Sequence, residues 1–281
     1  MGRSAHAGGL PCPDTRSQMG VLQAVLAAVV LQPTIAVVDT GANLRVPELA
    51  ARHPLVYDVR TRTRDVRDLN GHGTRVAQIV ARESPAARLM IVRAGSASGA
   101  FSDGNEAAAI RYAVDHGARI VNLSLGGPRT SAVERSAIRY AASRGVLVVA
   151  AVGDDYASRP EYPAALLGSN GLAVAAVLAD GTRAPFSNTG SWVSLAALGE
   201  GGTSFAAPLV SAAAARVWAA NPRLTARQVV TVLEQTASGR GTRTDELGYG
   251  VVDVAAAVAR AQELVPGSRA AGAWHGFRSA S

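Results

Sequence analysis

Three short, glycine-flanked motifs carry an aspartate, a histidine and a serine at widely separated points of the chain. They are Asp39-Thr40-Gly41, Asn70-Gly71-His72-Gly73-Thr74 and Gly201-Gly202-Thr203-Ser204-Phe205-Ala206-Ala207-Pro208. A serine hydroxyl is a weak nucleophile at neutral pH and needs a neighbouring base. An imidazole titrates in the right range to be that base, and a carboxylate can fix its tautomer. These residue types predict acyl transfer by an activated serine, if the fold brings them together.

Alternating strands and helices would position the three motifs. Short apolar runs rich in branched residues predict strands at 35–38, 89–92, 120–123, 146–151 and 172–177, and segments of helical period predict helices at 72–82, 103–116, 132–144 and 204–220. Strands that are apolar on both faces predict an α/β fold: a doubly wound, mostly parallel central sheet with helices on both faces. Reacting groups then gather at the carboxyl ends of the strands.

Residues at the helix ends agree with this pattern. Ser102 or Asp103 is suited to cap the helix that follows, and Gly117 and Gly145 come directly after predicted helix ends. Thr225, with Gln228 three residues later, predicts a capping box and so a further helix near the carboxyl terminus.

One domain is expected over residues 33–264, with a loose or short helical leader at 1–32 and a weakly ordered tail at 265–281. The leader contains an apolar run of 11 residues, Val21 to Leu31, which is too short to span a bilayer. No small-residue cleavage site separates it from the next apolar segment, which favours a short helix over an export signal. No transmembrane segment is expected, and the termini are candidates for docking a partner protein or domain.

The charge balance does not predict a nucleic-acid partner. The net charge is +7, but the densest basic stretch, Arg60 to Arg67, is interleaved with Asp58, Asp65 and Asp68, which predicts a solvated, self-neutralising loop. Aromatic residues make up only 5% of the chain and give no stacking platform for single strands. The single cysteine excludes an internal disulfide and any multi-cysteine metal site.

In their chain order, the three motifs resemble the Asp, His and Ser signatures of the subtilisin-like serine proteases, or subtilases. The resemblance extends from about Pro33 to Gln262. It implies that Asp39 orients His72, that His72 takes the proton, and that Ser204 attacks a peptide carbonyl to form an acyl-enzyme. The implied partner is a peptide or protein substrate, and no cofactor is expected.

Further segments resemble the substrate-binding parts of this family. Val121 to Gly127 resembles the strand that pairs with the substrate backbone and walls the pocket for the residue before the scissile bond, which makes Ser124, Leu125 and Gly126 candidate binding residues. Gly99 and Phe101 would lie on the opposite side of the cleft. The small residues of 124–127 and 150–153 predict a pocket that permits an apolar substrate residue without requiring one.

One departure from the family pattern falls on the predicted site. Where the family normally has an asparagine that donates to the oxyanion, this chain has Asp154. An ionised carboxylate only accepts hydrogen bonds and would repel the developing negative charge. Asp154 therefore stays protonated and donates, or leaves the Ser204 backbone N–H with less help, or makes the protein a poor protease. A register shift that moves Asp154 out of the site is the alternative.

Two absences also bear on function. Only about six residues separate the predicted histidine helix from the strand at Leu89, where many relatives carry a calcium-binding loop, so no metal is expected there. Fewer than 35 residues precede the first strand, which leaves no room for the folding prodomain of secreted relatives. The cytoplasm is therefore the expected compartment, and secretion is the alternative. The rival to a protease is a subtilase-like peptide-binding domain with impaired or partner-dependent catalysis.

Overall fold

The computed structural model describes residues 32–264. The expected leader and tail, and any docking through them, lie outside the described residues. Contacts divide the chain after Gln32, and every element described below belongs to the part that begins at Pro33.

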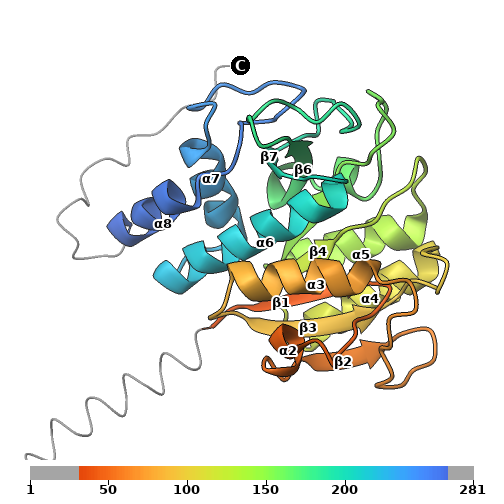
Figure 1. Cartoon of the computed structure of the whole chain (residues 1–281). Coiled ribbons are helices and arrows are strands. Elements are labelled where there is room, and N and C mark those ends of the chain that lie inside the picture. Colours follow the sequence, from red (N-terminus) through yellow and green to blue (C-terminus); the bar gives the residue numbers. More distant parts are fainter. Residues whose placement is uncertain (1–31, 265–281) are drawn as a thin grey trace, which may run out of the picture. The chain divides into compact units, whose positions relative to one another are not determined.

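Seven parallel strands form one sheet, in the order β2-β3-β1-β4-β5-β6-β7 (Figure 1). Their bounds are β1 (Thr34–Asp39), β2 (Leu55–Asp58), β3 (Arg88–Arg93), β4 (Ile120–Leu123), β5 (Leu147–Ala151), β6 (Gly171–Val177) and β7 (Leu195–Leu198). The order changes direction at β1, because β3 lies on one side of β1 and β4 on the other. Such a switch point is where open α/β sheets bind their ligands.

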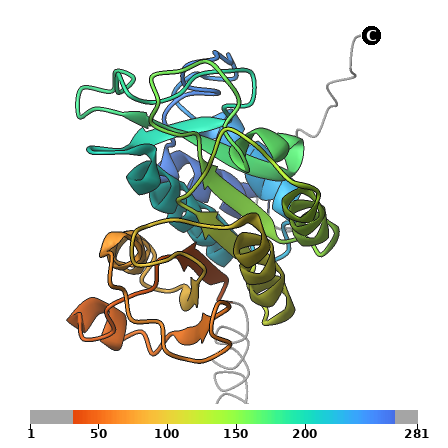
Figure 2. The same ribbon diagram turned by 90° about the vertical axis from the view of Figure 1, so that its right-hand side faces the viewer.

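Helices cover both faces of this sheet (Figures 1 and 2). Alternate residues of a strand point to opposite faces. Ile35 and Val37 of β1 belong to one buried cluster, whereas Ala36 and Val38 belong to another. The first cluster includes α3 (His72–Glu83), α6 (Thr203–Ala220), α7 (Ala226–Thr236) and α8 (Val254–Glu263), and the second includes α4 (Asp103–Asp115) and α5 (Ala132–Ser143). The doubly wound α/β fold predicted from the sequence is confirmed.

Short elements account for the differences from the predicted pattern. The four-residue strands β2 and β7 form the two edges of the sheet and each pairs with only one neighbour, so neither has the long apolar run of a central strand. The helix α2 (Pro47–Ala50) and the 3₁₀ turns η1 (Ala164–Leu166) and η2 (Gly168–Asn170) were also not predicted.

The predicted helix caps have the expected geometry. The Ser102 side chain accepts from the backbone N–H of Asn105, so Ser102 rather than Asp103 caps α4. Thr225 and Gln228 form the reciprocal capping box at the start of α7.

The prediction of a solvated, self-neutralising loop at 58–68 is wrong for Asp58, one of its three aspartates. Asp65 does pair with Arg67 on the surface, at 2.7 Å. Asp58, however, is fully buried at the end of β2, where its Oδ2 accepts from Nη1 of Arg93 at 3.3 Å. The parallel register of β2 and β3 places these two residues side by side, and β2 was the strand that the sequence pattern did not predict.

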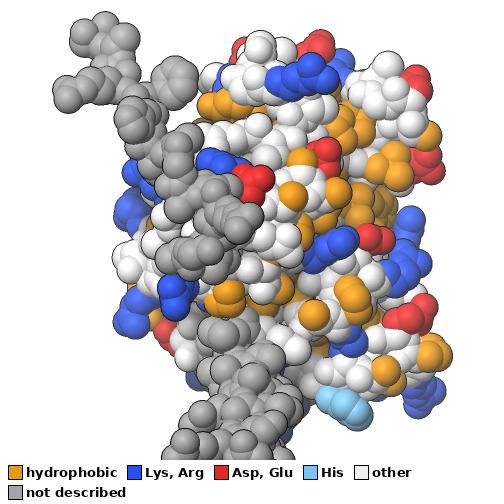
Figure 3. Space-filling view, turned by 90° about the vertical axis from the view of Figure 1, so that its left-hand side faces the viewer, with side chains coloured by type: hydrophobic (Ala, Val, Ile, Leu, Met, Phe, Trp, Pro, Cys, Tyr) orange, Lys and Arg blue, Asp and Glu red, His pale blue; other side chains and the backbone are white. Residues whose placement is uncertain are grey.

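The molecular surface carries both signs of charge. On the face in Figure 3, arginine and acidic side chains are interspersed among apolar ones, and the described residues visible there form no continuous basic patch. Within residues 32–264, no helix has both the length and the apolarity needed to cross a membrane.

Candidate active site

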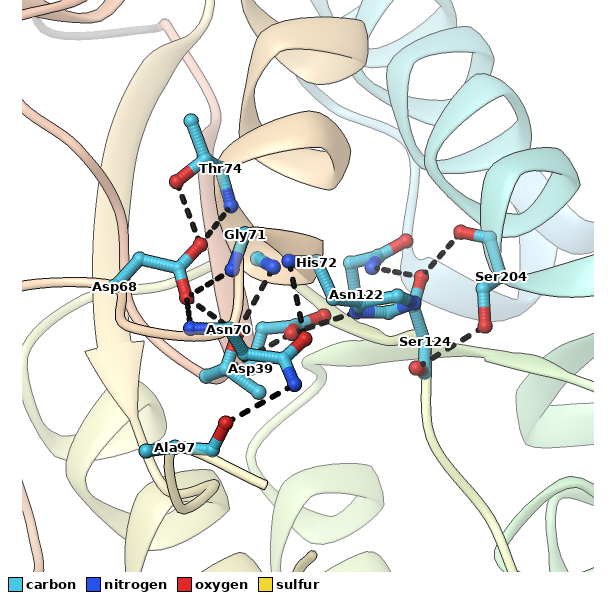
Figure 4. Close-up of polar contacts among 12 residues, drawn as sticks. Asp39, Asp68, Asn70, Gly71, His72, Thr74, Ala97, Asn122, Ser124 and Ser204 are labelled. Carbon is cyan, nitrogen blue, oxygen red and sulfur yellow. Dashed lines mark hydrogen bonds and ion pairs between the residues drawn. The ribbon is translucent and has the colours of Figure 1, made fainter. Parts of the chain in front are cut away.

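Three element ends hold the residues singled out for acyl transfer. Asp39 is the last residue of β1, His72 is the first residue of α3, and Ser204 is the second residue of α6. β1 lies at the switch point of the sheet, and α3 and α6 pack against each other on the same face. The fold thus brings the three motifs to one region, as Figure 4 shows.

Asp39 and His72 are directly hydrogen-bonded. Oδ1 of Asp39 lies 2.8 Å from Nδ1 of His72 and also accepts from the backbone N–H of Thr40 at 2.7 Å. Asp39 is fully buried, and its Oδ2 has no hydrogen-bond partner within residues 32–264. Because an ionised carboxylate can only accept, the arrangement places the proton on Nδ1 and leaves Nε2 of His72 as the basic nitrogen.

Glycines allow this close approach of β1 and α3. A Cβ atom at Gly73 would lie 2.3 Å from the carbonyl oxygen of Gly41, and one at Gly41 would lie 2.3 Å from the carbonyl oxygen of Val66. Both distances are too short for any side chain. The glycines next to Asp39 and His72 are therefore required by packing as well as by the turn.

The environment of His72 favours its protonated form. Burial of the imidazole lowers its pKa, but the hydrogen bond to Asp39 and the negative charges of Asp39 and Asp68 outweigh that effect. The pKa of His72 therefore lies above its usual value of 6.5.

Asp68 is a positioning residue that sequence reasoning missed. Its Oδ1 accepts from the Thr40 hydroxyl at 2.9 Å and from the backbone N–H of Gly71 at 2.8 Å. Its Oδ2 accepts from the backbone N–H and the hydroxyl of Thr74, at 2.8 and 2.6 Å. The carboxylate thus ties the end of β1 to the first turn of α3, on both sides of His72. The sequence did carry a signal for this role, because Asp68 stands two residues before Asn70-Gly71 and the start of a helix, where aspartates often accept from backbone N–H groups.

Ser204 is held by a reciprocal pair of hydrogen bonds with Ser124, which follows β4. The Ser124 hydroxyl donates to the carbonyl oxygen of Ser204 at 2.7 Å. That carbonyl lacks its usual helical donor, because the residue four positions later is Pro208, which has no N–H. Asn122 donates to the Ser124 hydroxyl at 3.0 Å and accepts from Ser211 at 2.9 Å, so a buried polar network supports the nucleophile position.

The Ser204 side chain points to the carbonyl of Ser124 in this structure. Its hydroxyl donates to that oxygen at 3.3 Å rather than to the imidazole of His72. The His72 ring is nevertheless close to the first turn of α6, because its centroid lies 5.7 Å from that of Phe205, the residue after Ser204.

Asp154 lies at the amino terminus of α6, beside the serine. Its Oδ1 accepts from the backbone N–H of Thr203 at 2.8 Å, and the Thr203 hydroxyl in turn accepts from the backbone N–H of Gly153 at 3.2 Å. The carboxylate therefore acts here as an acceptor at a helix amino terminus, a favourable place for negative charge. The carboxylate of Asp154 accepts from the N–H of Thr203 and not from that of Ser204, one residue further along α6.

The candidate substrate-binding residues fall into two segments. Ser124, Leu125 and Gly126 follow β4 directly. Gly99 lies next to Asn70, whose side chain donates to the carbonyl of Ala97 at 3.2 Å. The loop that contains Gly99 and Phe101 is thereby joined to the turn that precedes His72, whereas the Ser124 segment is joined to Ser204.

No cluster of three or more potential metal ligands of the types His, Cys, Asp and Glu occurs in residues 32–264.

Comparisons with known proteins match the chain to one protein family. A family model described as "Subtilase family" matches residues 32–250. The chain is 35% identical over 246 residues to subtilisin Savinase of Lederbergia lenta, which covers 79% of this chain and 89% of that protein. M-protease of Shouchella clausii (strain KSM-K16) is also 35% identical over 246 residues, but the match spans only 63% of its length.

A solved structure described as a cold adapted subtilisin-like serine proteinase has the same fold. It superposes with a TM-score of 0.67 at 29% sequence identity, over 78% of this chain and 86% of that one.

Proposed function

The chain belongs to the subtilase family, and on that basis we propose that it is a serine endopeptidase whose catalytic domain is residues 33–264. Asp39, His72 and Ser204 form its catalytic triad. The observation that carries the proposal is the hydrogen bond between buried Asp39 and Nδ1 of His72, with Ser204 in the first turn of the adjacent α6.

In the proposed reaction, the Ser204 side chain rotates away from the carbonyl of Ser124 toward His72. Nε2 of His72 takes the hydroxyl proton while Oγ bonds to the carbonyl carbon of the substrate. The tetrahedral intermediate then expels the amine, which receives the proton from His72, and leaves an acyl-enzyme. A water molecule, deprotonated by His72, releases the acid and restores Ser204. Asp39 stays ionised and stabilises the imidazolium in both halves.

Two segments, one on each side of the catalytic triad, bind the substrate in this proposal. Residues 124–126 pair with the substrate backbone on the Ser204 side, and residues 99–101 line the side that is joined to His72. This assignment is supported by the bonds that connect the segments to Ser204 and Asn70, respectively.

A peptide-binding domain with impaired catalysis is the less favoured function, because the curated relatives are named as proteases. Cleavage profiling on a peptide library separates the two. We expect the wild type to cut internal peptide bonds and Ser204→Ala to cut none. Equal cleavage by both would assign the activity to another group, and binding without cleavage by the folded wild type would favour the binding domain.

Replacing Asp154 by asparagine is expected to raise the turnover of peptides at neutral pH, by up to about 10²-fold. We propose that Asp154 occupies the oxyanion position, where a carboxylate that accepts from Thr203 gives the developing negative charge no donor. An amide supplies one, and such a donor contributes about 10²–10³ in kcat in subtilisin. The measurement is kcat of the purified variants on one peptide.

The matched control for this gain is Asp155→Asn. Asp155 is the adjacent acid, it is also exposed, and it pairs with Arg159 at 3.2 Å rather than with α6. We expect that variant to keep wild-type turnover. If Asp154→Asn is no faster than the wild type, Asp154 does not occupy the oxyanion position.

Activity is expected to increase as the pH rises through a midpoint above 6.5. His72 must be neutral to accept the serine proton, and the hydrogen bond and charge of Asp39 hold the pKa of His72 above its usual value. The rate of Ser204 modification by a small fluorophosphonate, measured against pH, reports this ionisation without involving a substrate side chain. A midpoint at or below 6.5 would contradict the assigned Asp39–His72 pair.

A further inference from the structure

A carboxyl group lies between the two segments that are expected to wall the substrate pocket. A Cβ atom at Gly126, after β4, would lie 3.1 Å from Oε1 of Glu161, and one at Gly153, after β5, would lie 3.0 Å from its Cγ. Glu161 therefore fills the space that two glycines leave open, between the segment after β4, which holds Ser124, and the segment after β5, which holds Asp154. The sequence pattern alone did not single out this residue.

The backbone around Glu161 is fixed in this position. The residue after it, Tyr162, exchanges two backbone hydrogen bonds of 2.9 Å with Gly127. The carbonyl of Glu161 accepts from the backbone N–H of Ala165 at 2.8 Å. The side chain is thus held against the segment after β4 by its own backbone rather than by a contact of its carboxyl group.

One oxygen of this carboxyl group has no donor among the described residues. Glu161 is 6% exposed, and no hydrogen bond to its buried Oε2 comes from any residue between 32 and 264. Burial is the largest of the effects that raise the pKa of Glu161 to about 7; the charges of Asp155 and Asp154 act in the same direction and that of Arg159 in the opposite one. A buried carboxyl without a donor costs free energy, which a bound cation or hydrogen-bond donor would recover.

We propose that Glu161 makes this endopeptidase selective for substrates with arginine or lysine immediately before the scissile bond. The proposal rests on the proposed function, because it takes residues 124–126 as one wall of the pocket for that substrate residue. In this proposal the Glu161 carboxyl binds the charged end of the substrate side chain that enters the pocket.

The surroundings favour a cation over an apolar side chain. The negative charges of Asp154 and Asp155 both act on Glu161, and Arg159, whose positive charge opposes them, is already paired with Asp155. A guanidinium or ammonium group would give Oε2 of Glu161 the donor that it lacks among the described residues, and a guanidinium can bond to both carboxylate oxygens at once. An apolar side chain would cover Oε2 and leave it unpaired.

Matched peptides test the proposal on the full-length wild-type protein. They differ only in the residue before the scissile bond, which is arginine, lysine, leucine, or citrulline as the neutral isostere of arginine. We expect kcat/KM for arginine to exceed that for citrulline by on the order of 10²-fold, the range found when one partner of a buried charge pair is lost. Lysine should also exceed leucine.

Glu161→Gln should abolish the difference between arginine and citrulline while cleavage of the citrulline peptide persists. The control is Glu234→Gln on α7, another carboxyl whose pKa burial raises to about 7, and it should retain the wild-type ratio. In the wild type, the arginine-to-citrulline ratio should rise as the pH passes about 7, because only ionised Glu161 attracts the cation. The pH series on the wild type tests the role of Glu161 even if the Glu161→Gln variant does not fold.

The outcomes distinguish this inference from the proposed function. A wild type that cleaves the leucine or citrulline peptide as well as the arginine peptide, at every pH, overturns the role of Glu161 and leaves the endopeptidase in place. A folded wild type that cleaves none of the peptides and does not react with a fluorophosphonate overturns the proposed function.

Discussion

Replacing His72 or Ser204 by alanine is expected to lower kcat by about 10⁶-fold, and the double variant should be no slower than either single one. The magnitude is carried over from subtilisin, in which the nucleophile and the base act as one unit. Once either group is missing, the other has nothing to act on, so the two losses do not add. Initial rates on a cleaved peptide measure all three variants.

The control for this loss is His116→Ala. His116 follows α4, and its side chain bonds through Nδ1 to the carbonyl of Tyr112 at the end of that helix, so its removal should leave kcat unchanged. Losses that multiply in the double variant would mean that His72 and Ser204 act independently. That result would contradict a shared proton transfer.

Asp39→Asn is expected to lower kcat by about 10⁴-fold with little change in the fold. The side-chain oxygen of asparagine can still accept from Thr40, but the amide removes the negative charge that fixes the proton on Nδ1 of His72. The wrong tautomer then faces the serine, and losses of this size follow in other triads. The midpoint of the pH profile should fall in the same variant, because Asp39 holds the pKa of His72 up.

Asp58→Asn is the matched control, since Asp58 is also a buried aspartate at the carboxyl end of a parallel strand. It pairs with Arg93 and does not touch His72, so kcat should stay within about tenfold of the wild type. A loss equal to that of Asp39→Asn would indicate a general effect of disturbing the sheet. An unchanged kcat in Asp39→Asn would remove Asp39 from the triad.

The sequence predicted the central part of the fold because the strands there are buried on both faces. The central strands β1 and β5 have continuous apolar runs, β4 has one interrupted only by Asn122, and the pattern located each strand to within one or two residues. The edge strands β2 and β7 are four residues long and lack that signal. Missing β2 led to the misassigned Asp58, because only the register of β2 with β3 places it against Arg93.

The site was predictable where residue type alone decides the chemistry. Asp39, His72 and Ser204 stand in motifs whose glycines and helix starts are visible in the sequence. Asp68 and Glu161 stand in no such motif, and their importance comes from what folding places around them. Five backbone and hydroxyl donors converge on Asp68. Glu161 instead lies between two glycines, and its buried Oε2 has no donor within the described part of the chain.

The central claim is that the imidazole of residue 72 and the hydroxyl of residue 204 act on one another, although the hydroxyl bonds to Ser124 in the resting structure. Mass spectrometry of the protein after reaction with a fluorophosphonate tests this most directly. The account predicts one adduct, on Ser204 of the wild type, and none in folded His72→Ala. An adduct on another serine, or equal modification of Ser204 in His72→Ala, would contradict it.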